Sequence, residues 1–160
     1  MARPRFPIEK KKDGRYRLQL SSDEREVLRA LPRQLLGLLG SNDPSLRRLT
    51  PPAHPDDPKM EAEYRELVGG ELDSRRRRSL EVMEETIEAK DLDEEQISAW
   101  LTALNDLRLV LGTRLDVTED LYEEGIPEDD SRAPLYAVYL YLGWLEEQVV
   151  SALAAGLPES

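Results

Sequence analysis

The chain has 160 residues, of which 39% are hydrophobic and 34% are charged, and it carries a net charge of −11 without any cysteine. This length and composition predict one globular domain with a true hydrophobic core. The lack of cysteine excludes disulfides, thiolate nucleophiles, thiol redox sensing and cysteine-ligated metals within these residues. We expect a cytoplasmic protein that does not enter the membrane. MARPRFPIEK is no secretory signal, and the longest apolar stretch falls short of the roughly 20 residues that span a bilayer.

The charge is unevenly distributed along the chain. Residues 1–17 hold seven basic and two acidic side chains, a net +5, so residues 18–160 carry −16. An acidic body repels nucleic acid at long range, because phosphate neutralisation dominates that kind of binding. The charge therefore favours a protein partner. Direct DNA binding is the alternative, through the basic residues of the N-terminal segment, namely Lys10, Lys11, Lys12, Arg15 and Arg17.

Residues 4–20 are predicted to form a short β-hairpin. Phe6 and Ile8 alternate with polar residues, and Asp13-Gly14 is a strong two-residue turn signal. The alternation resumes from Tyr16 onward, as the second strand of a hairpin requires.

The remainder of the chain indicates five helices. We therefore expect a mainly α, orthogonal or bundle-like domain with the short hairpin at its start. Capping residues and prolines mark the helix starts, and Gly69-Gly70 is expected to separate the second helix from the third. The predicted helices span residues 22–39, 58–68, 71–89, 93–116 and 134–156. A proline-rich crossing at 41–57 and an acidic loop at 117–133 complete the domain.

The stretch LNDLRLVLGTRLDV, residues 104–117, places polar side chains among leucines. At 100° per residue, Arg108 falls near the middle of the apolar face, and Gly112 one turn later allows a neighbouring helix to approach. A buried guanidinium needs acceptors. Asn105 is one candidate, and the others are carboxylates of neighbouring helices: Glu84, Glu85, Glu88, Glu146 and Glu147. We predict a structural lock that consists of Asn105, Arg108, Gly112, Arg114 and Asp116, with an anion-binding arginine as the alternative.

Arg75-Arg76-Arg77-Arg78 is the most basic run in the chain. Four consecutive helical residues sweep about 300°, so they cannot form one phosphate-facing stripe. Acidic residues at helical pair spacing, such as Glu71 and Glu81, predict a solvated, salt-bridged helix. A composite basic patch shared with the hairpin is the alternative.

The last predicted helix has almost no polar face over three turns. Tyrosine and tryptophan are enriched where one end of a ring meets water, as in protein interfaces. A small domain does not easily surround such a helix, so we predict that part of its surface is a homodimer or partner interface. The residues that would form it are Tyr136, Tyr139, Tyr141 and Trp144.

The sequence offers little for catalysis or metal binding. His54 is the only histidine, and a cation beside Asp56 and Asp57 would need carboxylates for its remaining ligands. The Glu-x-x-His pairs of dimetal bundles, the G-x-S-x-G elbow and glycine-rich phosphate loops are missing. We predict no catalytic residue, no metal and no cofactor, and an enzyme is the third interpretation.

The block WLTALNDLRLVLGTRLDVTED, Trp100 to Asp120, resembles the signature of an actinobacterial family of unknown function that is often encoded beside the Clp protease adaptor ClpS. The resemblance extends to the hairpin, to DEREVLRAL and to YRELVGGEL. Some members of the family are described as oxidative-stress regulators of transcription. The resemblance thus implies a non-catalytic regulator that acts through protein contacts, with RNA polymerase or a sigma factor as partner. Because this chain lacks cysteine, the resemblance does not imply that it senses oxidants through a thiol switch.

Overall fold

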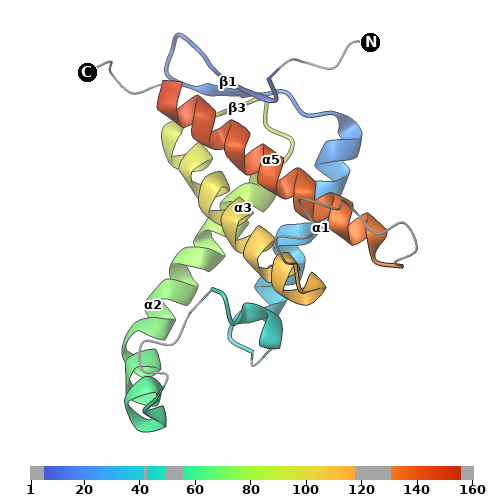
Figure 1. Cartoon of the computed structure of the whole chain (residues 1–160). Coiled ribbons are helices and arrows are strands. Elements are labelled where there is room, and N and C mark those ends of the chain that lie inside the picture. The colour runs from blue at the N-terminus through green and yellow to red at the C-terminus, as the bar shows by residue number, and fades with distance from the viewer. Residues whose placement is uncertain (1–5, 42, 50–55, 118–130, 156–160) are drawn as a thin grey trace.

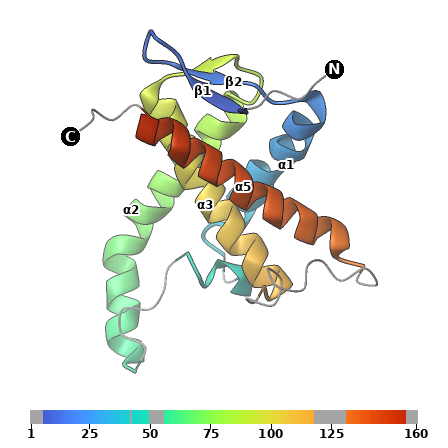
Figure 2. The same ribbon diagram turned by 45° about the horizontal axis from the view of Figure 1, so that its top comes forward.

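The computed structural model describes residues 6–41, 43–49, 56–117 and 131–155. It confirms a mainly helical domain with a short N-terminal hairpin (Figure 1). The described residues form four α-helices and one 3-10 helix, five helical elements in all, together with a small sheet. The sheet lies across one end of the helices (Figure 2).

The hairpin pairs β1 (Ile8–Lys10) with β2 (Tyr16–Leu18) in antiparallel register, and Gly14 adopts a positive φ of 90° in the turn between them. A third strand, β3 (Asp91–Leu92), pairs with the other edge of β2. The sequence did not predict β3, because two residues between helices show no alternation.

Helix α1 (Ser22–Leu38) begins where the sequence predicts. The Ser21 side chain accepts a hydrogen bond from the backbone of Glu24, whose own side chain accepts one from the backbone of Ser21, so the capping box is complete. A 3-10 helix, η1 (Pro44–Leu46), follows α1 within the region predicted as a crossing.

Helix α2 (Pro58–Glu85) is continuous, so the predicted separation into helices at 58–68 and 71–89 is wrong. Each helical glycine costs about 1 kcal/mol, whereas a break at Gly69-Gly70 would leave several backbone groups without helical partners. The first half of α2 extends away from the body of the molecule (Figures 1 and 2).

Helix α3 (Glu94–Leu115) occupies the centre and contacts α1, α2, α5 and η1. Helix α5 (Ala133–Ala155) crosses it (Figure 1). Both helices correspond closely to the predicted ones. Trp100 of α3 is fully buried, and its Nε1 donates to Thr86 Oγ1 at 2.7 Å. The helix that carries the polar stretch is therefore covered on several sides.

Candidate functional site

Arg108 lies at the interface of α3 and α5, where its Nε stands 3.1 Å from Glu146 Oε2. A Cβ built on Gly143 would lie 3.6 Å from Arg108 Cδ, so this glycine leaves room for the arginine. Arg108 keeps 34% of its side chain exposed and Glu146 keeps 14%. Burial raises the pKa of Glu146 even though Arg108 opposes the shift. The pair thus joins the two helices at the edge of the core, whereas the helical wheel placed Arg108 near the middle of the buried face.

Asp106 is the charged residue that the structure buries most deeply in α3. Its Oδ2 lies 3.6 Å from Arg76 Nε of α2 and accepts no hydrogen bond from the described residues. Burial raises the pKa of Asp106 to about 6, and the nearby Arg76 only partly offsets this effect. A helical wheel that assumes a single buried face does not predict the burial of Asp106. Asp106 lies on a second stripe at helical spacing with Ala103, Val110 and Thr113, all of which are buried, and this stripe could have indicated its burial.

The arginine run at 75–78 is only partly solvated. Arg76 reaches inward and donates to the carbonyl oxygen of Leu49 as well as facing Asp106. Arg77 Nη2 donates to the carbonyl oxygen of Leu39 at 2.9 Å, at the end of α1, where helical carbonyls lack intrahelical partners. The prediction of a solvated run is therefore wrong for Arg76, since its guanidinium ties α2 to α3 and to the segment after η1.

Gly112 permits a close contact between α3 and α5. A Cβ at this position would stand 2.9 Å from Tyr139 Cε2, closer than real side chains approach. Among the other predicted lock residues, Asn105 is half-buried and Arg114 is exposed, with its Nη2 3.9 Å from Asp43 Oδ2. The structure therefore places the predicted lock residues at separate contacts along α3.

Asp116 caps the end of α3 in the left-handed region, with a φ of 53°. Aspartate tolerates this conformation better than most residues with a side chain. Its role in the structure is thus helix termination, at an exposed position.

The four aromatic residues predicted as an interface divide into two groups. Tyr136 and Tyr139 are buried against α3, and the hydroxyl of Tyr136 donates to the carbonyl oxygen of Leu115 at 3.1 Å. Tyr141 is half-buried, and Trp144 keeps 38% of its surface exposed. The rings of Tyr141 and Trp144 lie 5.9 Å apart. Only this second pair is available on the surface.

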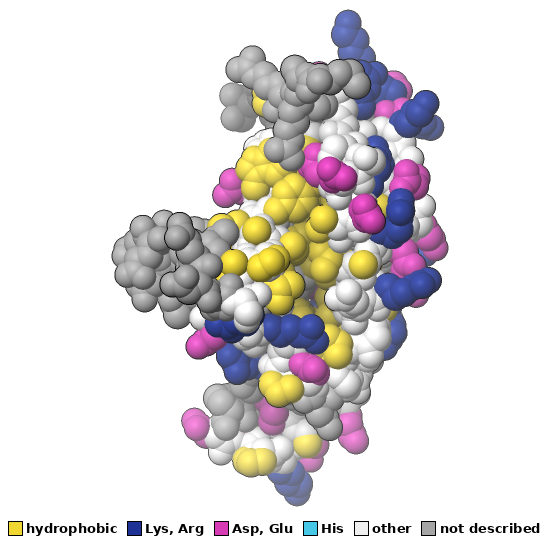
Figure 3. Space-filling view, turned by 90° about the vertical axis from the view of Figure 1, so that its right-hand side faces the viewer, with side chains coloured by type: hydrophobic (Ala, Val, Ile, Leu, Met, Phe, Trp, Pro, Cys, Tyr) yellow, Lys and Arg dark blue, Asp and Glu magenta, His cyan; other side chains and the backbone are white. Residues whose placement is uncertain are grey.

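An apolar strip lies between α1 and α5, beside this pair. The Tyr141 hydroxyl donates to Glu24 Oε2 at 2.7 Å and thereby links α5 to α1. Val27, one turn after Glu24, is 41% exposed, and Leu31 follows on the same face of α1. Figure 3 views the side where α1 and the beginning of α5 lie, and it shows hydrophobic side chains gathered down the middle of this face. We call the surface formed by Val27, Leu31, Tyr141 and Trp144 the α1–α5 strip.

The basic residues of the hairpin are partly neutralised. Lys11 Nζ lies 3.0 Å from Asp91 Oδ2 and 3.5 Å from Asp13 Oδ2. Arg17 is paired in register with Glu9 on one side and with Asp91 on the other. The exposed residues without an acidic register partner are Lys10, Lys12 and Arg15. The hairpin therefore presents mixed charge rather than the uniformly basic face that the DNA-binding alternative requires.

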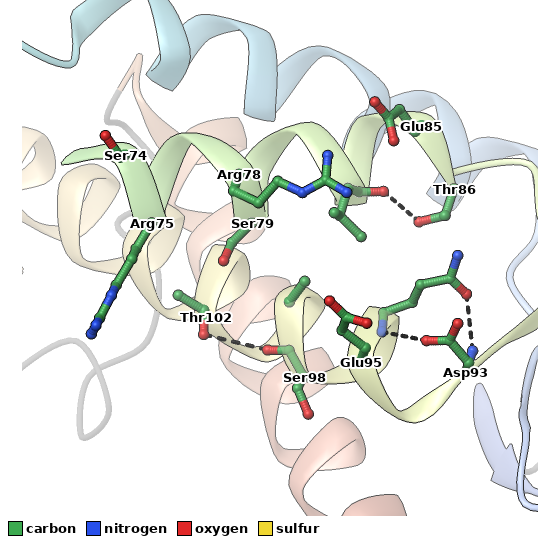
Figure 4. A pocket seen from close by; sticks show the side chains of 13 residues that line it. Ser74, Arg75, Arg78, Ser79, Glu85, Thr86, Asp93, Glu95, Ser98 and Thr102 are labelled. Atoms are coloured by element: carbon green, nitrogen blue, oxygen red, sulfur yellow. Dashed lines mark hydrogen bonds between the residues drawn. The ribbon is translucent and has the colours of Figure 1, made fainter. Parts of the chain in front are cut away.

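A second surface feature is an open groove of about 800 Å³ between α2 and α3 (Figure 4). Its charged lining residues include Arg75, Arg78, Glu85 and Glu95, and the Arg78 side chain extends along the groove toward Glu85. Small side chains, among them that of Ser98, also line the groove. We call this surface the α2–α3 groove.

His54 and residues 118–130 of the predicted acidic loop lie outside the described residues. Within residues 6–41, 43–49, 56–117 and 131–155, no group of acidic or histidine side chains is arranged to hold a metal ion. None of the helices in this part of the chain combines the length and the hydropathy that a membrane span requires.

The relatives of this chain include stress regulators from mycobacteria. A protein of Mycobacterium leprae, named as a candidate oxidative stress regulator AosR, is 31% identical over an alignment of 130 positions, which covers 71% of this chain and 59% of that protein. The "Oxidative stress regulator AosR" of Mycobacterium tuberculosis is 26% identical over an alignment of 187 positions, which covers 91% of this chain and 85% of that protein. No solved structure matches the chain. The family described as "Domain of unknown function (DUF2017)" matches residues 5–153, and the chain therefore belongs to that family.

Proposed function

We propose that this protein is a cytoplasmic, non-catalytic regulator of the stress response that acts by binding another protein on the α1–α5 strip. The observation that carries the proposal is the exposure of Val27 and Trp144 on either side of the Tyr141–Glu24 hydrogen bond. Single exposed apolar residues are ordinary, whereas hydrophobic side chains gathered on one face, as in Figure 3, together with an exposed tryptophan are typical of protein-binding surfaces. The names of the relatives support the stress-response part of the proposal.

We propose that the partner is a component of the transcription machinery. The family resemblance implies RNA polymerase or a sigma factor. The charged residues around the α1–α5 strip indicate which side chains a partner would need. Asp23 and Glu26 are exposed on α1 beside Val27, and Glu147 is exposed one turn after Trp144. Arg29 on α1 pairs instead with Glu88, which follows the end of α2. An apolar anchor flanked by lysine or arginine would complement these acidic residues.

The proposal is tested in a deletion strain that carries the gene for the protein or for a variant. Val27→Glu combined with Trp144→Glu places two charges in the α1–α5 strip and should abolish the transcriptional response and survival under hydrogen peroxide. Leu67→Glu is the matched control, because Leu67 is 83% exposed on the projecting half of α2. Polymerase or sigma factor should be captured from nuclease-treated lysate by the unaltered protein and by the control, and about 30-fold less by the double variant.

A full stress response from the double variant would contradict the proposal. A second copy of this chain is the other occupant to consider for the α1–α5 strip, as a homodimer. Sedimentation at tens of micromolar distinguishes a partner protein from a second copy of this chain. A homodimer formed at this surface would sediment as a dimer when unaltered and as a monomer in the double variant.

A further inference from the structure

We propose that Asp106 and Arg76 form a proton-controlled switch that determines how firmly residues 43–49 are held against α3. When Asp106 is protonated, Arg76 holds this segment through the carbonyl oxygen of Leu49, and when the carboxyl is ionised, Arg76 turns to Asp106. In the structure the Arg76 guanidinium lies within reach of both acceptors, because it donates to Leu49 while its Nε lies 3.6 Å from Asp106 Oδ2. None of these residues belongs to the α1–α5 strip, so the inference stands independently of the function proposed for that strip.

The arrangement in the structure suits a protonated Asp106. Its side chain is only 8% exposed, and Oδ2 accepts no hydrogen bond from the described residues. The separation of 3.6 Å from Arg76 Nε exceeds the roughly 2.8 Å of a charge-assisted hydrogen bond. A buried carboxylate without such bonds is far more costly than a neutral carboxyl. Burial accordingly raises the pKa of Asp106 to about 6, and the attraction of Arg76 only partly opposes this shift.

Ionisation of Asp106 changes the balance between the two acceptors of Arg76. A carboxylate attracts a guanidinium more strongly than a neutral carbonyl oxygen does, and burial strengthens the attraction. A shift of roughly 1 Å would bring Arg76 Nε into hydrogen-bonding distance of Oδ2. The guanidinium is planar and rigid, so a movement that brings Nε toward Asp106 also moves Nη2 relative to Leu49. The ionised state of Asp106 should therefore weaken the bond to Leu49.

Arg76 is the charged group whose attraction lowers the pKa of Asp106. The charged groups on the other elements packed against α3 face different partners: Arg33 of α1 faces Glu84, Glu146 of α5 faces Arg108, Asp91 of β3 faces Lys11, and Asp43 beside η1 faces Arg114. Arg48, which follows η1, lies toward Gly112, where a Cβ would stand 3.5 Å from its Nη1. Among the described residues, the response to ionisation therefore falls on Arg76.

The segment that Arg76 holds covers part of α3. Leu49 belongs to the hydrophobic core, and Leu46 packs against that core. The backbone N–H of Leu49 donates to the carbonyl oxygen of Leu46 at 3.0 Å, within a single short turn. A turn of this length depends on its tertiary contacts, because it is too short to be stable alone. Weakening of the bond from Arg76 should therefore loosen the cover of α3 on this side while the long helices remain intact.

The test is a nuclear magnetic resonance titration of the full chain between pH 4 and pH 8. The carboxyl carbon of Asp106, the Nε of Arg76 and the carbonyl carbon of Leu49 should titrate together. Their midpoint should lie between the ordinary pKa of 3.8 and about 6, because a closer Arg76 stabilises the ionised form. The Leu49 amide, corrected for the intrinsic pH dependence of exchange, should be roughly tenfold less protected at pH 8 than at pH 4.

Two substitutions of single groups decide whether the switch operates. Asp106→Asn keeps the side chain neutral, so the signals of Arg76 and Leu49 should retain their acid-state positions throughout the titration. Arg77→Gln is the matched control, because Arg77 donates to the carbonyl oxygen of Leu39 at 2.9 Å, and it should leave the titration unchanged. The amide of Leu104, which is fully buried, reports whether the core remains folded.

A Leu49 carbonyl signal that stays constant while Asp106 ionises would overturn the inference, since Arg76 would then not respond to the proton. A Leu49 titration that persists in Asp106→Asn would overturn it as well. Val27→Glu with Trp144→Glu should leave the titration unaltered, so the outcome is separate from the one that bears on the α1–α5 strip.

Discussion

Replacing Asp106 by asparagine should remove a pH dependence of stability that the native carboxyl imposes. The fold raises the pKa of this carboxyl from 3.8 to about 6, so the folded state holds a proton more tightly than the unfolded state. The contribution of this carboxyl to stability is therefore greatest below pH 3.8 and is lost as the pH rises through 3.8 toward 6. At about 1.4 kcal/mol for each pKa unit, the loss amounts to roughly 3 kcal/mol by pH 7.

The assay is urea unfolding followed by circular dichroism between pH 4 and pH 8. Asparagine resembles the protonated acid, so Asp106→Asn should have a stability similar to that of the native protein at pH 4 and should exceed it by up to about 3 kcal/mol at pH 7. Glu81→Gln, at an exposed position of α2, controls for the loss of one negative charge. A constant difference across the pH range would refute the raised pKa. A variant that becomes progressively less stable than the native protein would show that attraction to Arg76 outweighs desolvation.

Two further substitutions address the contacts between α3 and α5. Arg108→Met should cost about 1–3 kcal/mol because it leaves Glu146 buried without its partner, and adding Glu146→Gln should recover most of this loss; equal losses in the single and double variants would contradict the coupling. Gly112→Ala should also cost about 1–3 kcal/mol, since its Cβ would overlap Tyr139, whereas Gly37→Ala, where a Cβ meets open space, should stabilise α1 by up to about 1 kcal/mol. Thermal unfolding checks this pair, and melting temperatures that shift in the same direction would contradict the packing argument.

Features that depend on neighbouring residues were predictable from the sequence. The position of the hairpin turn and the cap at Ser21 are local, because the interacting groups lie within a few residues. The turn itself spans residues 12–14, one residue more than the predicted two-residue turn, because Lys11 pairs with Arg15. The strand β3 depends on pairing with a distant segment, and the continuity of α2 through Gly69-Gly70 depends on helix cooperativity. Neither can be predicted from local propensity alone.

The contacts of the candidate sites were harder to predict, because they also depend on how distant segments of the chain pack together. The sequence narrowed the partner of Arg108 to several carboxylates, one of which was Glu146, but could not choose among them without the crossing of α3 and α5. The burial of Asp106 was missed because α3 is covered on more than one face. The exposure of Trp144 likewise depends on which turns of α5 contact α1 and α3.

The pairing of β2 with β3 imposes an order on folding during synthesis. The paired residues, such as Tyr16 and Leu92, are about 75 positions apart. At the usual 5–20 residues per second, the ribosome takes roughly 4–15 s to make the segment between them. Throughout that time one edge of β2 has no partner within its own chain, although the helix that follows it can already form. We therefore expect the β3-facing amides of β2, such as that of Leu18, which donates to the carbonyl oxygen of Lys90, to acquire protection from hydrogen exchange only after the connection between α2 and α3 has emerged. The pairing of β1 with β2 does not depend on that connection.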